Sequence, residues 1–198
     1  TNIPQVESIQ VIEFVLETRE KPYRVPTKFI IDLLSIALKD NFFSYEGTFY
    51  KQCGGTSMGA VFAPSLANIF VDDFEHRYIL NDRNPYKQHI KCFRRYIDDI
   101  FLIWVGDEAS LKDFLQYMHE VQTTLSFTAN WNRDAITFLD LIIKQNEGKL
   151  ITTLYRKKTD KNTLLEYRSF HPRSLKDGLP YGQFLRIRRN CSRKEDYF

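Results

Sequence analysis

The stretch Phe93-Arg94-Arg95-Tyr96-Ile97-Asp98-Asp99-Ile100-Phe101-Leu102-Ile103-Trp104 places two adjacent aspartates between two runs of β-branched and aromatic residues. Such runs favour strands, and each is too short and too β-rich for a stable helix. We therefore predict a β-hairpin whose tight turn carries Asp98 and Asp99. Two carboxylates at a turn suit Mg²⁺ or Mn²⁺, which prefer oxygen ligands. A solvated turn without chemistry explains the same residues equally well, because aspartate favours turns for its own backbone hydrogen bonds.

A glycine-rich loop precedes this hairpin in the chain. The loop, Gly54-Gly55-Thr56-Ser57-Met58-Gly59-Ala60, follows an expected hairpin over residues 41–53 and leads into a helix expected from about Pro64. Glycines let backbone N–H groups approach a phosphate or a base closely, and a helix N-terminus attracts anions. The loop fits neither the P-loop nor the dinucleotide-binding pattern, so a plain strand-to-helix connector is the alternative.

A second pair of adjacent aspartates, Asp72 and Asp73, falls inside the helix that follows the loop. Neighbouring residues on a helix point about 100° apart, so these two carboxylates cannot share one cation. We interpret them as a solvated face or as salt-bridge partners.

The remaining elements are expected from hydrophobic periodicity, and together they give an α+β chain. Helices are predicted over residues 4–19, 26–41, 111–121 and 182–190, and strands over residues 125–131, 136–143 and 150–155. In the last helix we expect Phe184, Leu185 and Ile187 to face inward. No apolar run reaches the roughly 18 residues that a membrane-spanning helix needs, so we expect a soluble protein without membrane contact.

Charge is distributed unevenly along the chain. The whole sequence carries 28 Lys+Arg and 25 Asp+Glu, a net charge of +3. Residues 149–198 hold 13 of the basic and 5 of the acidic residues, whereas residues 1–148 hold 15 and 20. A basic tail on a mildly acidic body favours a polyanionic partner, most often nucleic acid. Plain solvated surface is the alternative interpretation of such a charge run.

Four motifs occur in an order that is more specific than any one of them. They are the glycine loop with Met58-Gly59 and Ala63-Pro64-Ser65-Leu66-Ala67-Asn68, then Arg95-Tyr96-Ile97-Asp98-Asp99, Phe138-Leu139-Asp140, and Tyr155-Arg156-Lys157. This order resembles the reverse transcriptases of Penelope-like retroelements, a group related to telomerase, over nearly the whole chain. The resemblance implies a partial polymerase palm with fingers elements in residues 1–155, an antiparallel sheet packed on helices. Residues 156–198 would form the basic, helical start of the thumb.

The resemblance also implies roles for individual residues. Asp98 and Asp99 match the YxDD catalytic motif, with Asp98 bridging two Mg²⁺ or Mn²⁺ ions and Asp99 as the outer ligand. Residues that would contact the template and the incoming nucleotide are Gln52, Gly55, Gly59 and Tyr96. Phe138 and Leu139 would brace the primer end, although core packing explains both equally well. Asp140 is expected to be a strand-edge or hairpin residue and not a metal ligand. Residues that would contact nucleic-acid phosphates are Lys157, Lys158, Arg186, Arg188 and Arg189.

The start of the chain, Thr1-Asn2-Ile3-Pro4, matches a family position that directly follows the first catalytic strand. The family's further metal-binding aspartate, and the aromatic residue that excludes ribonucleotides, would precede Thr1. Two-metal polymerases need that carboxylate, so we expect residues 1–198 alone not to polymerise nucleotides.

The implied partners are an RNA template, a DNA primer and deoxynucleoside triphosphates, in an intracellular, nuclear protein. One alternative is a noncatalytic nucleic-acid-binding remnant of such an element. The other is an α/β scaffold that binds no nucleic acid.

Overall fold

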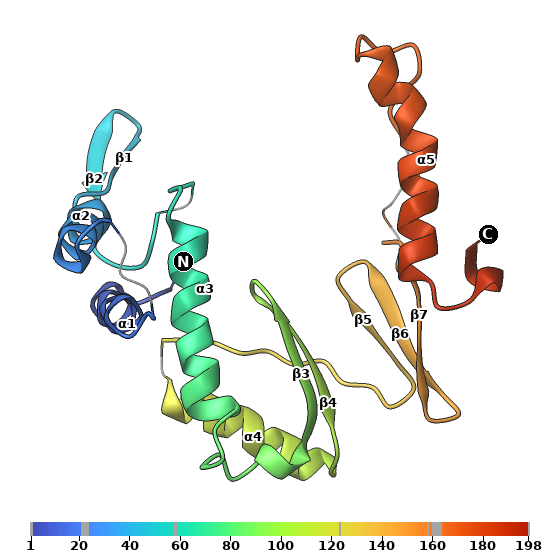
Figure 1. The fold of residues 1–198 in the computed structure, drawn as a ribbon, viewed down its shortest axis with the longest axis horizontal. Coiled ribbons are helices and arrows are strands. Elements are labelled where there is room, and N and C mark those ends of the chain that lie inside the picture. Colours follow the sequence, from blue (N-terminus) through green and yellow to red (C-terminus); the bar gives the residue numbers. More distant parts are fainter. Residues whose placement is uncertain are drawn as a thin grey trace. The chain divides into compact units, whose positions relative to one another are not determined.

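The computed structural model describes residues 2–20, 24–57, 59–122, 124–157, 159 and 164–197 (Figure 1). These residues form a mixed α+β protein with small antiparallel sheets, as expected from the sequence. The chain divides into two compact units, one up to Ala129 and one from Asn130 onward. Residues 130–155 therefore belong to the same unit as the basic tail.

The first unit holds four α-helices and two β-hairpins among its described residues. In chain order they are α1 (Gln5–Glu17), α2 (Thr27–Lys39), β1 (Phe42–Tyr45), β2 (Thr48–Lys51), α3 (Ala63–Phe74), the π-helical turn η1 (Glu75–Ile79), the 3-10 turn η2 (Lys87–His89), β3 (Ile90–Tyr96), β4 (Asp99–Trp104) and α4 (Glu108–Val121). Strand β1 pairs antiparallel with β2, and β3 pairs antiparallel with β4. The predicted helices of this unit and both predicted hairpins are confirmed, apart from their end residues.

Two hydrophobic clusters hold the first unit together, and α3 contributes to both. Phe70 of α3 packs with α1 and α2 in one cluster, around Val11 and Leu38. Phe74, at the end of α3, packs with α4 and the β3–β4 hairpin in the other, around the fully buried Phe114. Helix α3 therefore packs against the N-terminal helices α1 and α2 through one cluster and against the β3–β4 hairpin, which carries the aspartates, through the other (Figure 1).

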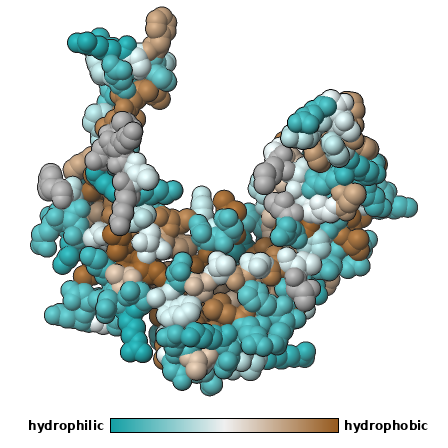
Figure 2. Space-filling view, turned by 180° about the vertical axis from the view of Figure 1, so that it is seen from behind, coloured by the Kyte–Doolittle hydropathy of each residue, from teal (hydrophilic) through white to brown (hydrophobic). Residues whose placement is uncertain are grey.

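Several apolar residues of α1 and α2 that follow the helical periodicity are exposed and not buried. Val6 of α1 and Phe29 and Leu33 of α2 are exposed, whereas Val11 and Leu38 are buried. Both helices carry apolar residues around more than one face, so the pattern predicts a helix without selecting its buried side. Figure 2 accordingly shows apolar residues scattered over the surface among polar ones.

The second unit is a three-stranded antiparallel sheet with a long helix attached to one edge strand. Its elements are β5 (Ala135–Phe138), β6 (Leu141–Asn146), β7 (Lys149–Leu154), α5 (Arg173–Asn190) and the 3-10 turn η3 (Lys194–Tyr197), with the strands in the order β5-β6-β7. The Thr152 hydroxyl donates to the Asn190 carbonyl at 2.7 Å, and the Ser192 amide donates to the Thr152 carbonyl at 2.9 Å. These bonds fix the C-terminal end of α5 to β7.

The strand predicted over residues 125–131 is wrong, because this segment is irregular. The Phe127 amide donates to Nε2 of His119 at 2.9 Å, and the Phe127 ring stacks on Phe74 with 5.6 Å between centroids. Leu125 and Phe127 thus pack against the core of the first unit from an irregular segment, whereas Trp131 is exposed.

The single strand predicted over residues 136–143 is also wrong. Leu139 has a φ of 53°, which turns the chain between β5 and β6, and Phe138 pairs with Leu141. The hairpin that the resemblance implies at Phe138-Leu139-Asp140 is confirmed. Strand β7 confirms the strand predicted over residues 150–155.

The terminal helix predicted over residues 182–190 is longer than expected, because α5 begins at Arg173 and contains Pro180. Proline lacks the N–H that a helix interior uses, yet α5 continues through Pro180. Phe184, predicted to face inward, is exposed, while Leu185 and Ile187 are half-buried.

Candidate functional site

The β3–β4 hairpin presents its two aspartates to solvent. Tyr96 pairs with Asp99 in the last rung of the ladder, so Ile97 and Asp98 form a two-residue turn. All four residues are exposed. Within the part of the chain that the structure describes, the Asp98 and Asp99 carboxylates make no hydrogen bond or ion pair, so their oxygens are accessible to a ligand.

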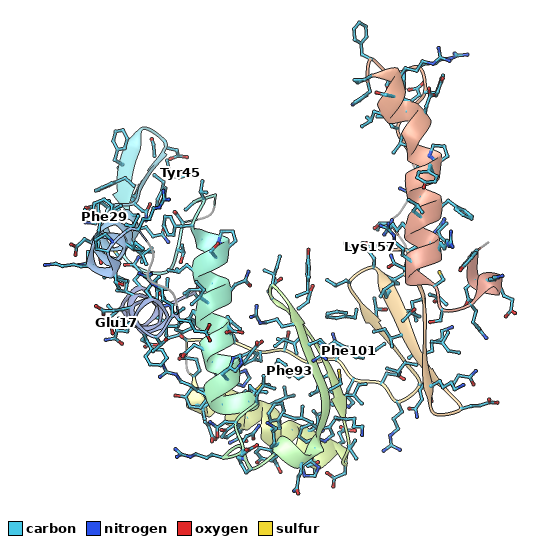
Figure 3. The ribbon with its side chains drawn as sticks, in the orientation of Figure 1. Glu17, Phe29, Tyr45, Phe93, Phe101 and Lys157 are labelled. Atoms are coloured by element: carbon cyan, nitrogen blue, oxygen red, sulfur yellow. The ribbon has the colours of Figure 1, made fainter. Side chains whose placement is uncertain are left out.

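Strand alternation separates a buried face of the hairpin from the face that carries Asp99. Phe93 pairs with Leu102 and lies in the core around Phe114. Tyr96, Asp99 and Phe101 project from the opposite face, because residues one apart on a strand point to opposite sides and directly paired residues share a side. Phe93 and Phe101 of this hairpin are labelled in Figure 3. The aromatic ring of Tyr96 and the Asp99 carboxylate are therefore neighbours on the outer face.

The turn has an unusual backbone for its sequence. Ile97 has a φ of 56° although it is β-branched, and its side chain is 55% exposed. A β-branched residue in the left-handed region costs about 1–2 kcal/mol, and its exposed side chain recovers little of this by burial. Backbone conformations of this kind persist where the surroundings impose them, and they are concentrated at functional sites.

Replacing Ile97 by asparagine is expected to raise the free energy of unfolding by about 1 kcal/mol, because asparagine tolerates positive φ and few apolar contacts are lost. Chemical denaturation measures the change. Leu139→Asn is the matched variant, since Leu139 is also exposed and has a φ of 53° at the turn of another hairpin. A loss of stability in Ile97→Asn would mean that the isoleucine side chain, and not the turn backbone, stabilises this hairpin.

Arg95 ties the turn to α3 and η1. Its Nε lies 2.5 Å from Oε1 of Glu75, and the two side chains are 12% and 9% exposed. Its Nη1 donates to Oδ1 of Asn68 at 2.9 Å and to the Ile97 carbonyl at 3.0 Å. Sequence reasoning assigned no role to Arg95, Asn68 or Glu75. Asn68 and Glu75 are seven residues apart, which places them on one helix face, and this spacing is the signal that could have grouped them.

The glycine loop needs glycine for its backbone. Gly55 has a φ of 67° and Gly59 has a φ of 88°. A Cβ at Gly59 would meet no atom within 4 Å, so the requirement there is conformational and not one of space. Gln5 fixes the loop by donating from Nε2 to the Gly55 carbonyl at 2.8 Å, and Gln52 donates from Nε2 to the Gly54 carbonyl at 2.8 Å.

Helix α3 brings the glycine loop and the aspartate turn into one region of the first unit. The loop enters α3 at Ala63. Asn68, which Arg95 contacts, lies five residues further along, or about 7.5 Å along the helix axis. Of the predicted nucleotide-contacting residues, Gly55 and Gly59 lie in the loop that leads into α3, and Tyr96 lies in the hairpin that Arg95 bonds to α3. Gln52 follows β2 and contacts the loop through the Gly54 carbonyl.

The side chains at the hairpin turn are of the kind that bind Mg²⁺ or Mn²⁺, the ions predicted there. Mg²⁺ commonly takes one or two protein carboxylates and fills its other positions with water and substrate phosphate. Asp98 and Asp99 supply two such carboxylates. Among the described residues, no cluster of three or more His, Cys, Asp or Glu side chains is placed to hold a metal ion.

The aspartates on α3 behave as salt-bridge partners, as predicted. Arg77 Nε lies 2.8 Å from Oδ1 of Asp73, and His76 Nδ1 lies 3.5 Å from Oδ2 of Asp72. This pair of carboxylates has partners one helical turn away, in contrast to the pair at the hairpin.

In the second unit, Arg186 belongs to an ion pair. Its Nη2 lies 2.7 Å from Oδ2 of Asp140, the residue after Leu139 in the β5–β6 turn. Asp140 is thus a hairpin residue, as predicted, and Arg186 fastens α5 to that hairpin. Phe138 is half-buried and Leu139 is exposed.

Most of the other residues predicted to contact phosphates in the second unit have side chains exposed to solvent. Arg188 and Arg189 near the end of α5, and Lys157 after β7, are exposed. Lys158 lies outside the described residues. Exposed guanidinium and ammonium groups of this kind are suited to phosphate contacts.

Comparison with known protein families gives a match at the C-terminal end of the chain. Residues 163–198 match the family model described as the animal helix-turn-helix domain. In the structure, the described part of this range contains α5 and η3. No curated protein and no solved structure matches the chain. Of the helices described, none has the length and apolar character needed to cross a membrane.

Proposed function

We propose that the chain is the palm and fingers part of a reverse transcriptase of the Penelope-like type, followed by the start of its thumb. The observation that carries the proposal is the exposed Asp98-Asp99 turn on a strained hairpin, with carboxylates that no described residue engages. The glycine loop that adjoins the same helix supports it. So does the order of the motifs along the chain.

The proposed reaction is the attack of a primer 3′ hydroxyl on the α-phosphate of a nucleotide, with pyrophosphate as the leaving group. Divalent cations at Asp98 and Asp99 would supply most of the charge stabilisation. The other predicted site residues would bind and orient the nucleotide. Tyr96 offers a flat ring beside Asp99 on which a base or sugar can stack, and the loop around Gly55 and Gly59 lets a nucleotide approach the backbone.

The basic tail would hold the nucleic acid. Arg188, Arg189 and Lys157 are exposed, whereas Arg186 is paired with Asp140. We therefore assign phosphate contacts to Arg188, Arg189, Lys157 and, by sequence, Lys158, and we assign Arg186 mainly to the docking of α5. The helix-turn-helix match is consistent with this role, because DNA-binding proteins of that class place a helix in the major groove. With a nucleic-acid partner of this kind, we propose a nuclear location for the protein.

Removing the charges of Arg188 and Arg189 together, as Arg188→Gln with Arg189→Gln, is expected to flatten the salt dependence of binding to an RNA–DNA primer–template. Each lost phosphate contact reduces the slope of log K against log salt by about 0.9, so the slope should change by about 1–2. Titrations at several salt concentrations measure it. The matched control is Arg77→Gln with Lys112→Gln, which removes two cations held in ion pairs of the first unit. An unchanged slope in the α5 variant would contradict the assignment.

RNA-templated extension of a DNA primer in Mg²⁺ tests the proposed function. We expect residues 1–198 alone to incorporate no deoxynucleotides, because the family's third carboxylate matches no position in this chain, and we expect a longer chain that supplies this carboxylate to incorporate them. Incorporation by residues 1–198 would overturn the expected need for that carboxylate.

The second candidate function is a noncatalytic nucleic-acid-binding protein derived from such an element. The basic α5 and the helix-turn-helix match favour it. Tight binding of the primer–template without nucleotide incorporation, even by a chain that supplies the family's third carboxylate, would select this candidate over the polymerase.

A further inference from the structure

Arg95 lies at the junction of three segments that surround the aspartate turn. It belongs to β3 and pairs with Ile100, which packs on the core around Phe114, so its side chain leaves the hairpin on the covered face. From there one guanidinium group reaches Glu75 in η1, Asn68 in α3 and the Ile97 carbonyl in the turn.

The partners of Arg95 are arranged to hold the guanidinium in one orientation. Glu75 is 9% exposed at its side chain and supplies the counter-charge, while Asn68 accepts at its side-chain oxygen. Glu75 begins the π-helical turn, where the Leu80 amide donates to the Glu75 carbonyl at 2.8 Å. Single π-helical turns within helices are found frequently at functional sites. The fork of donors on a planar guanidinium can satisfy these acceptors at the same time, which a lysine ammonium cannot do in the same plane.

The bond to the Ile97 carbonyl acts directly on the turn. The carbonyl of Ile97 and the amide of Asp98 belong to one rigid peptide plane. Holding that carbonyl therefore fixes the orientation of the plane from which Asp98 departs. It also offsets part of the cost of the positive φ at Ile97.

We propose that Arg95 is a positioning residue: with Asn68 and Glu75 it locks the Ile97–Asp98 peptide and so fixes the direction in which the Asp98 carboxylate is presented to a divalent cation at the turn. This inference rests on the proposed function, because it presupposes a cation at the turn. Arg95 itself does not touch the cation. Arg95 raises the affinity of the turn for the cation by holding the Ile97 carbonyl, and through it the backbone of the turn.

The test compares the unsubstituted chain with Asn68→Ala and Arg95→Lys in binding Mn²⁺. The readout is the dissociation constant obtained from paramagnetic broadening of the amide signals of residues 96–100. Loss of a residue that orients metal ligands typically weakens binding 10–100-fold, so we expect a rise of about tenfold or more in both variants. Asn68 is exposed on a helix and alanine is the better helix former, so Asn68→Ala should keep the thermal unfolding midpoint. If Arg95→Lys does not fold, Asn68→Ala alone still tests the proposal.

Two controls separate the inference from the proposed function. Arg77→Gln breaks an ion pair on the same helical segment without touching Arg95 and should leave the dissociation constant unchanged. Mn²⁺ affinity that is also unchanged in Asn68→Ala would overturn the role of Arg95 while leaving the metal site standing. Absence of broadening at the hairpin of the unsubstituted chain would instead remove the proposed function, and the role of Arg95 with it.

Discussion

Asp98→Asn is expected to abolish RNA-templated incorporation by a chain that supplies the family's third carboxylate together with residues 1–198, with a rate loss on the order of 10³-fold or more. The substitution keeps the size and the turn preference of the side chain but removes the charge that holds the cations. A cation that stabilises transition-state charge contributes several kcal/mol, and each 1.36 kcal/mol is about a tenfold change in rate. Single-turnover primer extension measures the loss.

The α3 aspartates supply the matched control for this variant. Asp73→Asn makes the same chemical change in a carboxylate that is paired with Arg77, and it should leave incorporation within a small factor of the unsubstituted rate. Asp98→Asn should also leave primer–template binding largely intact, because the proposed phosphate contacts lie elsewhere. Retention of incorporation in Asp98→Asn would contradict the assignment of the hairpin as the catalytic metal site.

Phe114→Ala is expected to lower the free energy of unfolding by about 3–5 kcal/mol, the range typical of truncating a fully buried phenylalanine. Phe114 is 0% exposed and stacks on Trp104 of β4 with 5.2 Å between centroids. It also meets the edge of the Tyr86 ring at 5.8 Å. The cavity would therefore open beneath the hairpin that carries Asp98.

Chemical denaturation measures this second effect, and Phe29→Ala is its control. Phe29 is the same residue type in the same unit but is largely exposed, so its truncation should change stability by about 0.5 kcal/mol or less. Similar losses in the two variants would mean that the core around Phe114 does not anchor the hairpin.

The aspartate hairpin could be predicted because its signals are local. Two β-rich arms and two turn-forming aspartates fall within one short stretch, and the structure forms the hairpin there. Its turn lies one residue earlier than predicted, because Ile97 and Asp98 form it and Asp99 pairs with Tyr96 in the ladder. The same holds for the β1–β2 hairpin, where Glu46 and Gly47 both have positive φ in the turn. The ion-pair role of Asp73 was also predictable, because Arg77 lies one helical turn away.

The features that could not be predicted depend on tertiary contacts. Residues 125–131 have the composition of a strand. The Phe127 amide nevertheless donates a hydrogen bond to His119, and the Phe127 ring stacks on Phe74, so the segment does not pair with a neighbouring strand. The buried sides of α1 and α2 depend on where α3 lies. The Arg95 contacts join residues 20 and 27 positions apart, which no local pattern encodes.

The most direct test of the central claim, that the Asp98-Asp99 turn is a divalent-cation site, is a map of Mn²⁺-induced broadening over the amide signals of the chain. We predict that the signals of residues 96–100 broaden first. We also predict that Asp98→Asn with Asp99→Asn abolishes this effect, while Asp72→Asn with Asp73→Asn leaves it in place. Broadening that spares the hairpin, or that survives the Asp98 and Asp99 substitutions, would contradict the account.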